Sequence, residues 1–159
     1  MTSTRVSYAL ESTLESVNTA EQAALEVAAS CGFDQDECGR IGIAVREATV
    51  NAILHGNQYD PGKRVTVCFE STPEGLTIAV RDEGPGLDPA TLPDPLAPEN
   101  FLKSSGRGIF LIRAFMDEVR FPDVSSGTEI TMTKYLRGAA KHAQDAPGDR
   151  AKNDQEASQ

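Results

Sequence analysis

Two short segments with alternating apolar residues, joined by a tight turn, constrain the fold of this chain most. Residues 64–70 (RVTVCFE) and 75–81 (GLTIAVR) carry β-branched residues at alternate positions. This alternation is typical of strands, and the joining sequence Ser71–Gly75, with Pro73 inside it, favours a hairpin turn. The two strands are therefore expected to be antiparallel, which argues against a doubly wound parallel sheet.

Helical patterns lie on both sides of this hairpin. Residues 14–31 have apolar side chains at helical spacing, and Gly32 follows as a C-cap. A second helix is expected to start near Asp34 or Asp36 and to end around residues 55–57. It is apolar over more than one face, which is typical of a central helix.

A third helix is expected to begin at residues 106–108, and further strands at 5–10, 118–121 and 128–135. The resulting order β–α–α–β–β–α–β–β predicts an α+β fold, in which helices pack on one face of a mostly antiparallel sheet.

The chain of 159 residues is expected to form one domain over residues 1–137. Residues 138–159 are polar and small, which predicts a disordered tail. Residues 83–105 hold five of the nine prolines and break the regular pattern, so we interpret them as a functional lid.

The formal charge of −9 argues against direct binding of nucleic acid or of an anionic membrane. No apolar stretch approaches the roughly 20 residues that span a bilayer. The three cysteines lack metal-site spacing and suit a reducing compartment, so a cytoplasmic protein without zinc is expected. An acidic surface suits a partner with exposed Arg or Lys.

Glu47 and Asn51 lie four residues apart on the second predicted helix, and therefore on one stripe. A carboxylate and a carboxamide that face the same way could orient a nucleophile and hold hydrated Mg²⁺. A solvated polar stripe is the alternative. His55, one turn further on, could face the metal site or pack near the end of the helix, and we favour packing.

Two glycine-rich segments are the next candidates. Asp82 ends a predicted strand and is followed by Gly84 and Gly86, which suits a carboxylate that accepts hydrogen from an adenine amino group. Residues 106–108 (Gly-Arg-Gly) open a helix, whose free N–H groups can bind phosphate. A plain turn and an ordinary helix start are the alternatives, and Thr128 after Gly127 could contact a base or simply fill a strand.

Taken together, in this order and with these gaps, the four segments resemble the ATP-binding motifs of the GHKL ATPase superfamily. The strings REATVNAILHGN, VRDEGPGLD, GRGIFLIRAFMDEV and GTEITMTKYL are similar to the anti-sigma-factor serine kinases of the general-stress and sporulation type. The resemblance covers about residues 5–137 and implies a two-layer α/β sandwich of the Bergerat type.

The resemblance implies a role for each matching residue. Asn51 would coordinate Mg²⁺, Glu47 would act as the base, and Asp82 would bind adenine. Gly84 and Gly86 would shape one end of the lid, Gly106 and Gly108 the other, with the amides of residues 106–108 meeting phosphate. Thr128 would lie near the base edge. Lys103 and Arg107 are the candidates for a cation at the γ-phosphate, and we favour Lys103.

The resemblance also implies a function: an ATP- and Mg²⁺-dependent protein serine/threonine kinase that phosphorylates an anti-anti-sigma antagonist and sequesters a sigma factor. A homodimer is implied as well, and residues 5–10 with the helix from Leu14 are the expected surface. One alternative is a nucleotide-sensing anti-sigma or adaptor module without catalysis. Another is a free-standing ATPase subunit, which a chain of 159 residues does not favour.

Overall fold

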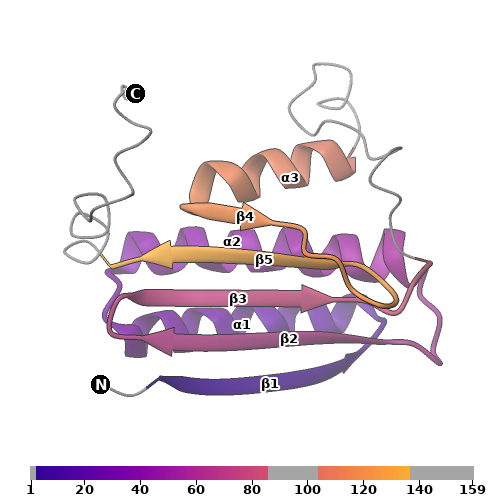
Figure 1. Ribbon diagram of the computed structural model, residues 1–159, viewed down its shortest axis with the longest axis horizontal. Coiled ribbons are helices and arrows are strands. Elements are labelled where there is room, and N and C mark those ends of the chain that lie inside the picture. The colour runs from indigo at the N-terminus through magenta and orange to yellow at the C-terminus, as the bar shows by residue number, and fades with distance from the viewer. Residues whose placement is uncertain (1–2, 86–103, 137–159) are drawn as a thin grey trace.

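The computed structural model describes residues 3–85 and 104–136, which form a five-stranded antiparallel sheet covered by helices on one face (Figure 1). The strand order is β1-β2-β3-β5-β4. The strands are β1 Thr4–Glu11, β2 Arg64–Thr72, β3 Gly75–Arg81, β4 Glu118–Arg120 and β5 Glu129–Tyr135.

The helices have recognisable local signals at their ends. α1 (Leu14–Cys31) is capped by the Thr13 hydroxyl and ends at Gly32, whose φ of 104° suits glycine. α2 (Gln35–Asn51) is capped by the Asp34 side chain and continues without a break into a π-helical turn, η1 (Ala52–Gly56). The third α-helix, α3, spans Ser104–Phe115.

Strand side chains alternate between the helix layer and the open face of the sheet. Val67 of β2 pairs with Val80 of β3, and both are buried beneath the helices. Their neighbours Thr66 and Arg81 pair with each other on the opposite, helix-free face. α2 packs between α1 and α3, as a helix that is apolar over several faces must.

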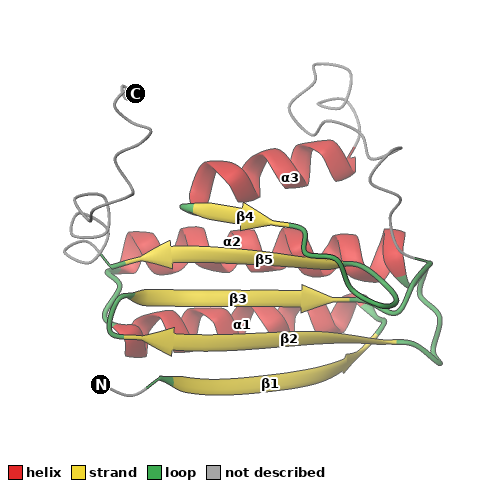
Figure 2. Cartoon of the chain, in the orientation of Figure 1, coloured by secondary structure: helices red, strands yellow, loops and turns green. Residues whose placement is uncertain are grey.

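The α+β fold and its antiparallel sheet are confirmed. The predicted boundaries of α1 and β3 agree with the structure, whereas α3 begins at Ser104 instead of Gly106. The C-terminal end of β3 and the loop into β5 lie at the same end of the sheet (Figure 2). The predicted tail at 138–159 and most of the predicted lid lie outside the described residues. Within the part of the chain that is described, no helix is long and apolar enough to cross a membrane.

Candidate nucleotide-binding site

Asp82 is a buried carboxylate at the end of β3, with 5% of its surface exposed. Its Oδ1 accepts hydrogen bonds from the N–H groups of Gly84 (2.9 Å) and Thr128 (3.1 Å), and its own N–H donates to the Thr128 carbonyl (2.9 Å). These bonds join the end of β3 to the start of β5. They leave Oδ2 without a hydrogen bond to any residue in the described segments.

The environment of Asp82 disfavours its charge. Burial raises the pKa of the carboxyl group above its usual value, because the charged form loses its hydration. The hydrogen bonds from Gly84 and Thr128, and the more distant charges of Lys63 and Arg81, act in the opposite direction. A buried carboxylate with one free oxygen is well suited to accept hydrogen from a neutral donor.

Glycines allow the end of η1 to touch this aspartate. A Cβ atom on Gly56 would overlap the Asp82 carboxylate, and one on Gly84 would overlap the Gly56 carbonyl oxygen. Gly127 has a φ of 75°, and a Cβ there would overlap the Asp82 carbonyl oxygen. Three backbone segments therefore meet around Asp82 at contact distance, which only glycine permits at these positions.

Glu47 and Asn51 lie on the face of α2 that meets α3. Both are half-buried, and a Cβ on Gly108 of α3 would lie 2.9 Å from Glu47 Oε1 and 3.6 Å from Asn51 Nδ2. Within the described ranges, neither side chain makes a hydrogen bond to another residue. A fully solvated polar stripe is therefore not what is observed, because α3 covers part of both side chains.

The helix that carries Asn51 also reaches Asp82. Gly56 follows Asn51 by five residues along α2 and η1, and it is in contact with the Asp82 carboxylate. Asn51 and Asp82 therefore lie near the same end of the sheet, on its helix side. The structure does not separate them onto opposite sides of the molecule.

The remaining predicted residues are placed in part. Thr128 lies beside Asp82 and contacts it through its backbone N–H and C=O. Gly106 and Arg107 lie in the first turn of α3, while Gly86 and Lys103 lie outside the described residues. The roles of these four residues stay predictions. His55, expected to pack near the end of the helix, is exposed instead.

Two features were not recognised in the sequence. Gly56 was interpreted only as the end of a helix, and Asn57 only as the start of a loop, yet Asn57 is 1% exposed. The sequence His-Gly-Asn after an apolar helix hints at a special helix end. The contacts of Gly56 and Asn57 with residues 82–84 depend on tertiary structure that no local pattern reveals.

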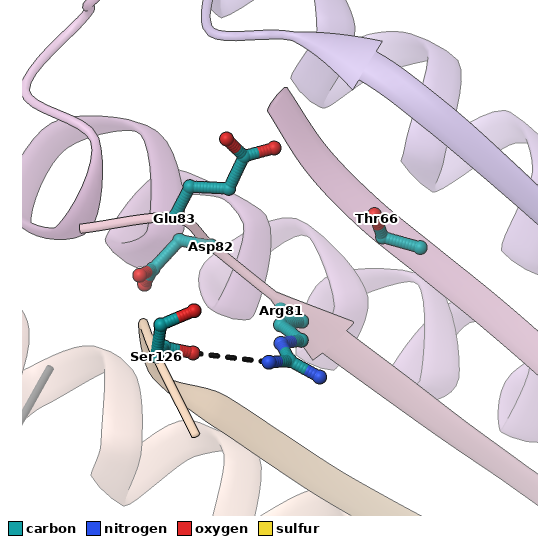
Figure 3. A pocket seen from close by; sticks show the side chains of 5 residues that line it. All are labelled: Thr66, Arg81, Asp82, Glu83 and Ser126. Carbon is teal, nitrogen blue, oxygen red and sulfur yellow. Dashed lines mark hydrogen bonds between the residues drawn. The ribbon is translucent and has the colours of Figure 1, made fainter. Parts of the chain in front are cut away.

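A cavity of about 360 Å³ lies next to Asp82 on the helix-free face of the sheet (Figure 3). It is lined by Thr66, Arg81, Asp82, Glu83 and Ser126, and Arg81 donates a hydrogen bond to the Ser126 carbonyl (3.1 Å). Thr66 and Arg81 belong to the helix-free face, whereas the Asp82 carboxylate contacts Gly56 on the helix side. This cavity therefore lies on the opposite face of the sheet from Asn51 and α3.

Comparison with known proteins identifies the family of this chain. Residues 10–134 match the histidine kinase-like ATPase domain family. The serine-protein kinase RsbW of Bacillus subtilis (strain 168) is 35% identical over 118 residues, which cover 70% of this chain and 73% of the relative. The serine-protein kinase RsbW of Staphylococcus epidermidis is 33% identical over 113 residues, which cover 67% of this chain and 70% of the relative.

A solved structure shares the fold. The histidine kinase domain from the Erythrobacter litoralis EL346 blue-light activated histidine kinase superimposes with a TM-score of 0.52 at 17% identity. The match covers 83% of this chain and 64% of that one, and at this identity it concerns the fold alone. The family match and the sequence relatives together show that this chain belongs to the histidine kinase-like ATPase domains of the GHKL type, in the family of RsbW anti-sigma-factor serine kinases.

Proposed function

We propose that this chain is an ATP-dependent serine/threonine protein kinase that phosphorylates an anti-anti-sigma antagonist and sequesters a sigma factor. The observation that carries this proposal is that the α2–η1 helix contacts both other segments. Gly56 lies against the Asp82 carboxylate, and Gly108 of α3 lies against Glu47 and Asn51. The RsbW relatives, which are named serine-protein kinases, support the choice of reaction.

Asp82 is the residue we assign to the adenine base. Its Oδ2 has no hydrogen-bond partner among residues 3–85 and 104–136, while Oδ1 is held by two backbone N–H groups. A fixed carboxylate of this kind accepts hydrogen from the exocyclic amino group of adenine. In this proposal Gly84 and Gly86 would allow the backbone to approach the base closely, and Thr128 would lie beside its edge.

Asn51 is the residue we assign to Mg²⁺. Its carboxamide is half-buried, lies near Gly108 and has no competing hydrogen bond within the described ranges, which fits a neutral oxygen ligand of a hard cation. The described residues contain no group of three His, Cys, Asp or Glu side chains that could hold a metal. Mg²⁺ usually keeps several water ligands and takes others from phosphates, so the bound ion would also neutralise the charge of the phosphates.

Glu47 is the residue we assign as the general base. It precedes Asn51 by one helical turn and faces the same side of α2. Its carboxylate would accept the proton of the substrate hydroxyl while that oxygen forms a bond to the γ-phosphorus, and ADP would leave as the old bond breaks. Phosphoryl transfer depends chiefly on positioning and charge neutralisation, so no protein nucleophile is required.

The start of α3 is the segment we assign to the phosphates. Gly106 lies in its first turn, where backbone N–H groups lack helical partners and can bind anionic oxygens, whereas Gly108 follows that turn. Lys103 and Arg107 remain the candidates for a side-chain cation at the γ-phosphate.

We also propose that the chain forms a homodimer through β1 and the start of α1. Val6 of β1 is 41% exposed and Leu14 of α1 is 56% exposed, so both apolar side chains are available for contacts across such an interface. The net charge of −9 further suits a sigma factor or antagonist with exposed Arg or Lys.

A phosphorylation assay tests the kinase proposal. The chain is mixed with radiolabelled ATP, Mg²⁺ and a candidate antagonist domain, and alkali-labile phosphoserine or phosphothreonine is expected on the antagonist. The alternative is a nucleotide-sensing anti-sigma or adaptor module, which would bind ATP and its partner without transferring phosphate. The retained Glu47 favours the enzyme, because sequestration alone requires no base.

A further inference from the structure

Asn57 is a buried polar residue that the proposed mechanism does not use. It directly follows η1, and 1% of its surface is exposed. Its side chain makes three hydrogen bonds to three different parts of the chain. Oδ1 accepts from the Glu83 N–H (2.8 Å), and Nδ2 donates to Ser12 Oγ (2.9 Å) and to the Arg64 carbonyl (3.0 Å).

The bond to Glu83 acts on the peptide group that joins Asp82 to Glu83. The N–H of this peptide is held by Asn57, while its carbonyl oxygen lies against Gly127. A peptide group is planar, so fixing both ends fixes its orientation and, with it, the backbone ψ angle of Asp82. This ψ angle places the Gly84 N–H that donates to Asp82 Oδ1, so the hold on the carboxylate depends in part on Asn57.

The same segment is held from several directions. Gly84 donates to Asp82 Oδ1 and lies against the Gly56 carbonyl, and the Glu83 carboxylate accepts from the Arg64 N–H (3.3 Å). The side chain of Asn57 is the only one of these links that joins the end of the α2–η1 helix to this peptide group by a hydrogen bond in the described structure. It connects the helix that carries Asn51 to the segment that carries Asp82.

We propose that Asn57 is a positioning residue that holds the Asp82–Gly84 turn in the conformation that binds adenine. This inference rests on the proposed nucleotide site, but it adds a residue that does not touch the nucleotide. In its absence the Glu83 N–H loses its partner, the Asp82–Glu83 peptide can rotate, and the hold on the carboxylate weakens.

Ser12 provides a matched control within the same buried network. Its hydroxyl accepts from Asn57 Nδ2 and donates to the Lys63 carbonyl (2.6 Å), and it makes no hydrogen bond to residues 82–84. Ser12→Ala therefore removes buried hydrogen bonds on the far side of Asn57 and leaves the bond to Glu83 in place. If Asn57 served stability alone, Ser12→Ala and Asn57→Ala would have similar effects on ATP binding.

The test measures ATP affinity by calorimetry at a temperature where each variant is folded. Asn57→Ala is expected to weaken ATP binding by about 10-fold or more, because a turn that is no longer held must be ordered on binding. Ser12→Ala is expected to stay within about 3-fold of the original affinity, since that change is below the effect of one hydrogen bond.

Two results would overturn the inference: unchanged ATP binding in Asn57→Ala, or an equal loss in Ser12→Ala. Amide hydrogen exchange without nucleotide gives an independent reading. The Glu83 amide is expected to exchange about 10-fold faster in Asn57→Ala and unchanged in Ser12→Ala. If the original chain fails to bind ATP, the proposed function is rejected. Exchange at the Glu83 amide still decides whether Asn57 holds the turn, and equal exchange rates in all variants would reject this positioning role of Asn57.

Discussion

Replacing Asp82 by Asn separates the structural role of this residue from its proposed role at adenine. The amide oxygen of an asparagine can take the place of Oδ1 and accept from the N–H groups of Gly84 and Thr128. The amide nitrogen then takes the place of Oδ2 and presents a donor where adenine requires an acceptor. The fold is therefore expected to survive, while recognition of the base is lost.

The magnitude follows from one hydrogen bond to a charged acceptor. Such a bond contributes about 1.5–3 kcal/mol, which corresponds to about 10- to 150-fold weaker ATP binding in Asp82→Asn. Isothermal titration calorimetry with ATP and Mg²⁺ at neutral pH measures this loss directly. Circular dichroism and thermal unfolding confirm that the variant is folded at the temperature of the titration.

Asp60→Asn is the control for the change in charge. Asp60 is exposed in the loop after η1 and accepts a hydrogen bond from the Gly62 N–H (2.8 Å), so its substitution removes the same negative charge away from the site. It is expected to bind ATP like the original chain. An affinity of Asp82→Asn within about 3-fold of the original, or an equal loss in Asp60→Asn, would refute the assignment of Asp82.

Three further predictions concern the base, the contact at Gly56 and the titration of Asp82. Glu47→Gln should lower the rate of phosphate transfer at saturating ATP by about 10²- to 10⁴-fold without weakening ATP binding, because glutamine keeps the shape of the side chain but cannot accept the proton. An unchanged rate in a phosphorylation assay would reject Glu47 as the base. Gly56→Ala should lower the free energy of unfolding by about 1–3 kcal/mol, because its Cβ would overlap the Asp82 carboxylate. Gly39→Ala in α2, where a Cβ meets nothing within 4 Å, should raise the free energy of unfolding by about 0.5–1 kcal/mol. Urea titration measures both variants, and equal effects of the two substitutions would contradict the close contact at Gly56. Because burial raises the folded-state pKa of Asp82 above 3.8, the folded chain binds this proton more tightly than the unfolded chain. As pH falls from neutral to about 4, the original chain should therefore gain stability relative to Asp82→Asn, and the opposite trend in unfolding free energies would contradict the raised pKa.

Much of the fold could be predicted because its signals are local. The alternation in residues 75–81 and the caps at Thr13, Asp34 and Gly32 determine where β3, α1 and α2 begin or end, and neighbouring residues supply these signals. The α+β class followed from the order of elements, since a hairpin after two consecutive helices leaves the sheet antiparallel.

The end of α2 was harder to predict. A helical pattern assumes 3.6 residues per turn, and η1 departs from it with a wider turn in which the Asn57 N–H donates to the Ala52 carbonyl five residues earlier. The contact of Gly56 with the Asp82 carboxylate accompanies this wider turn, and it depends on a strand that follows later in the sequence.

The candidate site was predictable where its residues share one helix or one motif. Glu47 and Asn51 could be placed on one stripe because a helix of known period carries both. Asn57 could not be recognised, because its side-chain partners Ser12, Arg64 and Glu83 lie 45, 7 and 26 residues away in the sequence. Hydrogen bonds at such separations arise from tertiary packing, which a pattern of residue types does not encode.

Competition between ATP and GTP is the most direct test of the central claim that Asp82 and Asn51 belong to one adenine nucleotide site. Adenine presents an amino group where guanine presents a carbonyl oxygen, and only the amino group can donate to the Asp82 carboxylate. In a titration with Mg²⁺, the chain should bind ATP at least about 10-fold more tightly than GTP, and Asp82→Asn should remove this preference. Equal affinity for the two nucleotides, or no binding of ATP by the folded chain, would contradict the account.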